Sequence, residues 1–167
     1  MEKKDKVTEK LFLLLIDENR GTISKFCYLY SDSIMLFDDL YQEVIYNLWK
    51  SYPKFQGNSK ESTWVYRITI NTCISFLRKK YKRPKYDILN INTTLSIPTE
   101  DSSEYFENLK EVYNLINKLH SIDKTLILLW LDGKSYKEIS EILIMSVSNV
   151  ASRLNRVKSK LEKTFNS

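Results

Sequence analysis

The sequence predicts an all-α protein, with two small helical domains joined by a flexible linker and a helix-turn-helix as the C-terminal domain. Apolar residues recur at spacings of three or four along most of the chain, which is the period of an amphipathic helix. The 167 residues include only three Gly and three Pro, so the turns that join strands are barely signalled. A polar stretch without this periodicity separates the two periodic parts and is typical of a linker.

The first domain, residues 1–83, is predicted to contain three helices. The pattern predicts the first helix over residues 8–31, with a break near Gly21. The second covers residues 33–51, where one apolar stripe is made of Ile34, Phe37, Tyr41, Val44, Ile45 and Leu48. A loop over residues 52–59 follows, because Pro53 and Gly57 cannot continue the helix.

The third helix, predicted over residues 61–82, has two distinct faces. Its core face is predicted to consist of Trp64, Ile68, Ile74 and Leu77. A polar face that becomes basic carries Arg67, Asn71, Ser75, Arg78 and Lys82. No carboxylate occurs from Ser62 to Tyr86, whereas a solvated helix usually mixes both signs of charge. The absence favours a polyanionic partner.

Residues 84–102 lose the helical period and contain Pro, Asn, Thr and Ser, which predicts the linker. The second domain is assigned to residues 103–167. Its first helix is expected to run from Ser103 to Leu119, and Ser121 or Asp123 is expected to cap the next one.

The last part of the chain has the signals of a helix-turn-helix. Gly133 suits the end of one helix, and Ser135 with Glu138 matches a capping box at the start of the next. Ser146 can cap the final helix. The apolar seam of that helix consists of Val147, Val150, Leu154, Val157 and Leu161.

The opposite surface of the final helix carries short hydrogen-bonding side chains mixed with Arg. Its members are Ser148, Asn149, Ser152, Arg153, Asn155, Arg156 and Ser159. Such side chains can read base edges and grip phosphates, and a helix-turn-helix lays its second helix in the major groove. A plain solvated face would explain a lone helix, but the capped first helix, the short turn and the missing carboxylates together favour DNA binding.

Composition excludes several other classes. The net charge of +5 fits a nucleic-acid partner, although solubility alone would also explain it. Cys27 and Cys73 are predicted to be small buried hydrophobes, and the only histidine is His120, so we expect no metal site, no cofactor and no enzyme. The apolar run over residues 11–16 is too short for a signal peptide or a membrane span, which predicts a cytoplasmic protein without membrane insertion.

Two motifs precede the helix-turn-helix: Asp38-Asp39-Leu40-Tyr41-Gln42-Glu43, and Phe55-Gln56-Gly57-Asn58-Ser59 followed by Thr63-Trp64-Val65-Tyr66-Arg67-Ile68. Together with the helix-turn-helix, in this order, they resemble the extracytoplasmic-function group of sigma factors, the promoter-specificity subunits of bacterial RNA polymerase. The resemblance extends from about Leu15 to Phe165. It implies that the first domain binds core polymerase and opens the minus-ten element, while the second binds the minus-thirty-five element.

The resemblance also implies roles for individual residues. Asp39, Gln42 and Glu43 would contact core polymerase. Phe55 lies in the loop that captures a flipped base, and the melted strand or its flanking phosphates would be contacted by Tyr66, Arg67, Asn71, Arg78, Lys79 and Lys80, with Trp64 mostly in the core. Minus-thirty-five DNA would be contacted by Ser148, Asn149, Ser152, Arg153, Asn155 and Arg156, with Arg153 on phosphate.

Structural explanations compete with some of these roles, and two positions depart from the family pattern. Carboxylates at a helix start can simply favour the dipole, and Phe55 can fill a gap in the core. Many members have Gly where Ile144 stands, so a turn that needs a positive φ would be strained here. Many have a basic residue where Ala151 stands, which removes one candidate DNA contact.

The resemblance implies a non-enzymatic transcription initiation factor whose partners are bacterial core RNA polymerase and promoter DNA. Anti-sigma factors are common partners in the family, and the sequence leaves open whether this chain has one. The alternative is a stand-alone helix-turn-helix regulator that binds operator DNA without polymerase. A third class, an RNA-binding or structural helical protein, also stays open.

Overall fold

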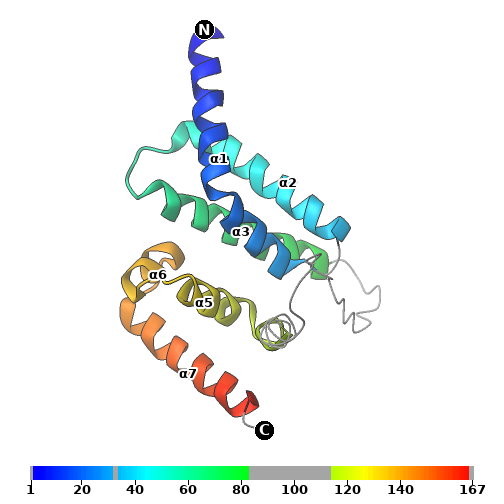
Figure 1. Ribbon diagram of the computed structural model, residues 1–167, viewed down its shortest axis with the longest axis vertical. Helices are drawn as coiled ribbons and strands as arrows, with labels where there is room; N and C mark the ends of the chain where they lie inside the picture. Colours follow the sequence, from blue (N-terminus) through cyan, green and yellow to red (C-terminus); the bar gives the residue numbers. More distant parts are fainter. Residues whose placement is uncertain (1, 32–33, 83–113, 166–167) are drawn as a thin grey trace, which may run out of the picture. The chain divides into compact units, whose positions relative to one another are not determined.

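The computed structural model describes the backbone of residues 2–31, 34–82 and 114–165, and every regular element in these ranges is a helix. The chain divides into two compact units, Met1–Leu95 and Ser96–Ser167. Figure 1 labels the helices α1 (Glu2–Tyr30), α2 (Ile34–Ser51), α3 (Glu61–Lys82), α5 (Ser121–Leu131), α6 (Tyr136–Leu143) and α7 (Val147–Phe165). A short 3-10 helix, η1 (Tyr52–Lys54), follows α2. The predicted fold class is confirmed. The 84–102 linker and most of the 103–119 helix lie outside the described residues.

In the first unit, α1, α2 and α3 pack on one another around a shared core. The largest fully buried side chains of this core are Ile23, Phe26, Leu40, Val44, Leu48, Val65 and Ile70. The predicted break near Gly21 is wrong, because α1 runs without interruption from Glu2 to Tyr30. Gly21 is exposed, and burial of Ile23 and Phe26 in the next turn stabilises the helix across the glycine.

The core face of α3 differs from the predicted one. Trp64, Ile68, Ile74 and Leu77 are only half-buried. The fully packed side is instead made of Thr63, Val65, Tyr66, Thr69, Ile70, Thr72 and Cys73. Three threonines on this side gave it a polar appearance in the sequence. A prediction from apolar residues alone therefore gave a core face of α3 that is rotated around the helix axis from the observed one.

Cys27 of α1 and Cys73 of α3 are neighbours in the core of the first unit. Both are free thiols with no exposed surface, which confirms the prediction of small buried hydrophobes. The hydrogen bond with Cys27, together with burial, raises the pKa of the Cys73 thiol far above its ordinary value. Because the thiolate is the reactive species, the raised pKa and the burial make the Cys73 thiol a poor nucleophile in the folded protein.

The second unit begins its described part with a turn of helix at residues 114–117 and continues with α5. The middle of α5 is buried throughout, from Thr125 to Leu129. The N-cap of α5 is His120, not Ser121 or Asp123 as predicted. At the other end, Gly133 has φ +72°, and the N–H groups of Gly133 and Lys134 donate to the carbonyls of Trp130 and Leu129 in a Schellman motif.

The capping box that starts α6 is present as predicted. The Ser135 N–H donates to Glu138 Oε2 at 2.9 Å, and the Glu138 N–H donates to Ser135 Oγ at 3.2 Å. Ser146 caps α7 by accepting from the Asn149 N–H at 3.2 Å. The seam of α7 is buried at Val150, Leu154 and Val157, with Leu161 half-buried. Val147, which was assigned to this seam, is 46% exposed.

Candidate nucleic-acid interface

The predicted polymerase-binding residues lie on the outer side of α2. Asp39 and Gln42 are exposed and Glu43 is half-buried. The buried side of the same helix consists of Leu40, Val44 and Leu48. Because α2 begins at Ile34 and has no acidic residue in its first turn, the helix dipole does not explain these carboxylates. Their position on an open surface suits a contact with a partner.

Sequence reasoning missed two aromatic residues that continue this side of α2. Tyr46 and Trp49 are 57% and 44% exposed. They follow Gln42 at steps of four and three, which places all three on one side of a helix, so counting from Gln42 would have found them. Trp49 also packs edge-on against Phe12 of α1, with ring centroids 4.9 Å apart. The face therefore combines carboxylates with exposed aromatic surface.

The loop before α3 is attached to that helix through aromatic contacts. Phe55 is half-buried, and its ring centroid lies 5.1 Å from that of Trp64. Trp64 in turn lies 6.2 Å from Tyr52 of η1. Gly57 has φ +71°, a backbone conformation that lets the loop reverse direction and that side chains other than glycine rarely adopt. Gln56 and Asn58 beside it are exposed.

The predicted DNA face of α3 is exposed at Asn71, Ser75, Arg78 and Lys79. Arg67 is half-buried, and the side chain of Lys80 lies outside the described residues. Tyr66 differs from the expectation, since it is only 6% exposed and packs edge-on against Phe26 at 5.9 Å. In this structure Tyr66 belongs to the core, and it could reach DNA only by leaving Phe26. Tyr66 is therefore not part of the exposed face of α3.

The predicted reading face of α7 is exposed at Ser148, Asn149, Ser152, Asn155 and Arg156. No carboxylate occurs on α7 before Glu162. These side chains follow a capped helix start, where the N-terminal residues of a recognition helix contact base edges. The arrangement can supply hydrogen bonds to bases and the exposed guanidinium of Arg156.

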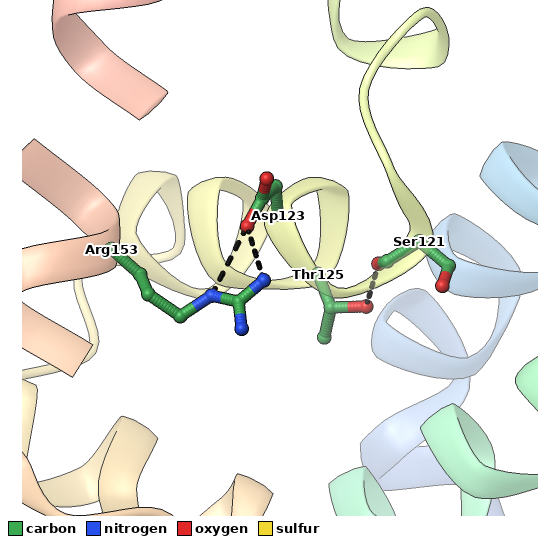
Figure 2. A network of polar contacts seen from close by, with 4 residues as sticks. All are labelled: Ser121, Asp123, Thr125 and Arg153. Atoms are coloured by element: carbon green, nitrogen blue, oxygen red, sulfur yellow. Dashed lines mark hydrogen bonds and ion pairs between the residues drawn. The ribbon is translucent and has the colours of Figure 1, made fainter. Parts of the chain in front are cut away.

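Arg153 does not lie on this exposed face with its neighbours. Figure 2 shows its guanidinium turned to Asp123 in the first turn of α5. Arg153 Nη2 donates to Asp123 Oδ1 at 2.9 Å, and Nε donates to the same oxygen at 3.3 Å. The two side chains are 29% and 20% exposed. The structure thus places the predicted phosphate contact in an ion pair within the unit, which no spacing along the sequence could have indicated.

A second cation of α7 is also held inside the unit. The Lys158 ammonium lies 3.8 Å from the ring centroid of Trp130 and 5.9 Å from that of Tyr136. A cation over an indole face is attracted by the ring quadrupole. Lys158 therefore joins α7 to α5 and to the start of α6. The basic character of α7 available to DNA is smaller than the sequence indicates.

The turn between α6 and α7 has a positive φ at Ile144, the position where many members of the family have Gly. Ile144 has φ 54° and ψ 52°, in the left-handed region, and its side chain is 80% exposed. The Met145 N–H donates to the Ser140 carbonyl at 3.0 Å and closes the end of α6. The turn thus keeps a shape suited to glycine while carrying a β-branched residue, at a cost in backbone strain.

Comparison with known proteins matches both units to one family. The Sigma-70 region 2 family matches residues 15–83, and the Sigma-70, region 4 family matches residues 109–161. The ECF RNA polymerase sigma-E factor of Haemophilus influenzae is 33% identical over 135 residues, which cover 74% of this chain and 71% of that protein. The chain belongs to the ECF sigma factors.

Other ECF sigma factors match over a larger share of the chain. SigW of Bacillus subtilis is 28% identical over 165 residues, or 91% of this chain and 87% of SigW. The fold is also that of the sigma factor RpoE solved in complex with the anti-sigma factor NepR from Bartonella quintana. That likeness has a TM-score of 0.74 at 21% identity and covers 95% of this chain and 96% of RpoE. The family resemblance stated from the sequence motifs is thus confirmed.

Proposed function

We propose that this ECF sigma factor binds bacterial core RNA polymerase and directs promoter recognition and transcription initiation. The observation that carries the proposal is the presence of both sigma regions on one chain, in family order. A stand-alone regulator would need only the helix-turn-helix. By the same likeness an anti-sigma factor is a further candidate partner, as NepR is for RpoE of Bartonella quintana.

The first unit supplies the polymerase contact and the minus-ten contact. Asp39, Gln42 and Glu43 dock on the polymerase through the outer side of α2, and the exposed side chains of Tyr46 and Trp49 extend the same face. The loop at Phe55 and the face of α3 hold the melted strand. Capture of a flipped base there offsets the few kcal/mol of stacking that each extruded base loses.

The second unit binds the minus-thirty-five element with the exposed face of α7. Neither small unit needs to bind DNA tightly, because tethering both to one polymerase raises the effective concentration of the second. The chain forms and breaks no covalent bond itself. We place its action in the cytoplasm, where bacterial polymerase works; within the described ranges, no helix is long and apolar enough to cross a membrane.

The test is co-elution of the full-length protein with sigma-free core polymerase in gel filtration at moderate salt. Asp39→Lys combined with Glu43→Lys is expected to abolish co-elution, because both carboxylates face the docking partner. The matched control is Asp17→Lys with Glu18→Lys, which makes the same charge change on an exposed part of α1. Thermal unfolding of both variants checks that each is folded.

Run-off transcription with the co-eluting complex then identifies promoters that depend on the protein. Failure of the folded wild-type protein to co-elute would contradict the proposal. Equal loss in the two double variants would also contradict it, because the effect would then come from net charge and not from the outer side of α2.

A further inference from the structure

The ion pair between Asp123 and Arg153 separates one arginine of α7 from its DNA-facing neighbours. Arg153 lies between Ser152 and the Asn155–Arg156 pair, all of which are exposed, yet its guanidinium points to α5 (Figure 2). We propose that Arg153 is a positioning residue, which sets the orientation of the recognition helix through Asp123 and binds no phosphate. The inference rests on the proposed function, since it assumes that α7 reads promoter DNA.

The geometry of the pair suits a positioning role. Two donors of the planar guanidinium, Nε and Nη2, meet one carboxylate oxygen at 3.3 and 2.9 Å. Because two donors share one acceptor, one edge of the planar guanidinium is turned to α5, an orientation that a single ammonium does not define. Both side chains are mostly shielded from solvent, so the contact is screened less than a pair on the open surface.

The carboxylate partner, Asp123, belongs to a helix that is well packed in the second unit. Asp123 is in the first turn of α5, where the helix dipole favours a negative charge. The residues of α5 from Thr125 to Leu129 are buried, and the Thr125 hydroxyl donates to the Ser121 carbonyl at 2.8 Å (Figure 2). Leu154, beside Arg153, has no exposed surface. The pair therefore fixes α7 in the same turn that carries Asn155 and Arg156.

The opposite assignment makes a different prediction for one variant. If Arg153 exchanged Asp123 for a DNA phosphate, the carboxylate would compete with DNA, and Asp123→Asn would tighten binding. If Arg153 positions α7, Asp123→Asn instead weakens recognition of the correct element, because the base-reading side chains lose their alignment. A phosphate contact acts on all sequences alike, whereas a positioning residue affects the difference between correct and incorrect sequences.

The experiment uses full-length protein in complex with core polymerase. The DNA probe is a promoter selected by that complex from a library randomised over the minus-thirty-five window, paired with the same DNA in which this window is scrambled. Dissociation constants for both probes are measured over a range of salt concentrations. The variants are Arg153→Gln, Arg153→Lys, Asp123→Asn, the combination of Arg153→Gln with Asp123→Asn, and the exchanged pair Asp123→Arg with Arg153→Asp. Thermal unfolding confirms that each is folded.

We expect Arg153→Gln and Asp123→Asn to lower the preference for the selected probe by similar factors, roughly tenfold, and their combination to add little. Arg153→Lys should lose most of the preference too, although a lysine would still serve as a phosphate contact. The exchanged pair should recover part of it. The slope of log affinity against log salt should stay that of the wild type in every variant.

The positioning role would be overturned if Arg153→Gln reduced the salt slope by about 0.9, the change expected for one lost phosphate contact. Tighter binding of both probes by Asp123→Asn would overturn it as well. A wild-type complex that selects no sequence from the library would instead overturn the proposed function, and the inference with it. The two failures are therefore distinguishable.

Discussion

The ring of Phe55 rests against Trp64, with centroids 5.1 Å apart, so the loop before α3 is attached to the first turn of that helix. The contact gives Phe55 a partly structural role, in line with the alternative interpretation of the sequence that Phe55 fills a gap in the core. It also gives Trp64 a role beyond the core. Through Tyr52, the same indole connects the loop to the aromatic pair formed by Phe12 and Trp49. The loop is thus held by a cluster of aromatic rings that contact one another.

Trp64→Ala should therefore impair promoter melting more than polymerase binding. Without the indole the loop loses its support, and a misplaced loop cannot capture a flipped base. We expect transcription from duplex promoter DNA to fall at least tenfold, and to recover largely on a template that is already unpaired at the minus-ten element. Trp130→Ala, in the other unit, is the matched control and should leave the ratio between the two templates unchanged. A Trp64 variant equally impaired on both templates would argue against the idea.

Ile144→Gly should stabilise the second unit. A left-handed backbone costs an L-residue roughly 1–2 kcal/mol, and glycine gives back about 0.5–1 kcal/mol of this in lost chain entropy. Little burial is lost, since the Ile144 side chain is 80% exposed. We expect a net gain of about 1 kcal/mol, measured by hydrogen exchange of α6 and α7 amides.

Gly133→Ala is the mirror control for this prediction. Gly133 has φ +72° with nothing within 4 Å of an added Cβ, so no steric clash contributes to the outcome. The strain of roughly 1–2 kcal/mol is partly offset by about 0.5–1 kcal/mol of unfolded-chain entropy, so we expect a net loss of about 1 kcal/mol. If Ile144→Gly left the stability unchanged while Gly133→Ala lowered it, the α6–α7 turn of the wild type would relieve the strain that the Ile144 side chain imposes.

Local features were predicted correctly from the sequence where a residue type has one common role, such as starting or ending a helix. Ser135 with Glu138, Ser146 and Gly133 all act as the helix starts and stops that their positions indicated. For Ile144 the sequence indicated only a condition, that a turn needing a positive φ would be strained there, and the φ of 54° meets that condition. Each of these rests on chemistry within about five residues of chain.

The features that the sequence did not predict depend on residues far apart in the chain. The pairing of Arg153 with Asp123 joins positions 30 residues apart, so the arginine looked available for phosphate. Tyr66 looked like a DNA contact until the structure placed it against Phe26. The core face of α3 was misjudged because threonines form much of it, and their methyl groups pack while the hydroxyl makes the residue count as polar.

One of those threonines has an unsatisfied hydroxyl. Among the described residues, Thr69 Oγ1 is the buried side-chain oxygen without a hydrogen-bond partner. Thr69→Val should stabilise the first unit by about 1–3 kcal/mol, since valine keeps the shape and removes the desolvation cost. Thr125→Val is the control: the Thr125 hydroxyl donates to the Ser121 carbonyl at 2.8 Å, and its loss should cost about 1 kcal/mol. Urea unfolding of each variant measures the two changes in the free energy of unfolding, and hydrogen exchange in α3 and α5 locates them. Destabilisation by Thr69→Val would point to a bound water at the Thr69 hydroxyl.

Lys124 should make the stability of the second unit depend on pH in the alkaline range. Burial lowers the pKa of the Lys124 ammonium from its ordinary value of 10.5. Between the lowered value and 10.5 the unfolded chain holds a proton that the folded chain has released, so the free energy of unfolding rises with pH there. Below this window the folded protein bears the full cost of a partly desolvated charge.

Lys124→Met removes that cost. Among the contacts that it also removes is the bond from Nζ to Asn117 Oδ1 at 3.1 Å, which is exposed and therefore weak. We expect the variant to be more stable than wild type at pH 7 and the difference to shrink as the pH approaches 10.5. Urea unfolding of both proteins at matched pH values measures the difference directly, because other titrating groups cancel. Lys118→Met, at an exposed position nearby, controls for the lost charge and should show no such trend. A difference between Lys124→Met and wild type that stays constant with pH would mean that the ammonium is solvated in the folded protein.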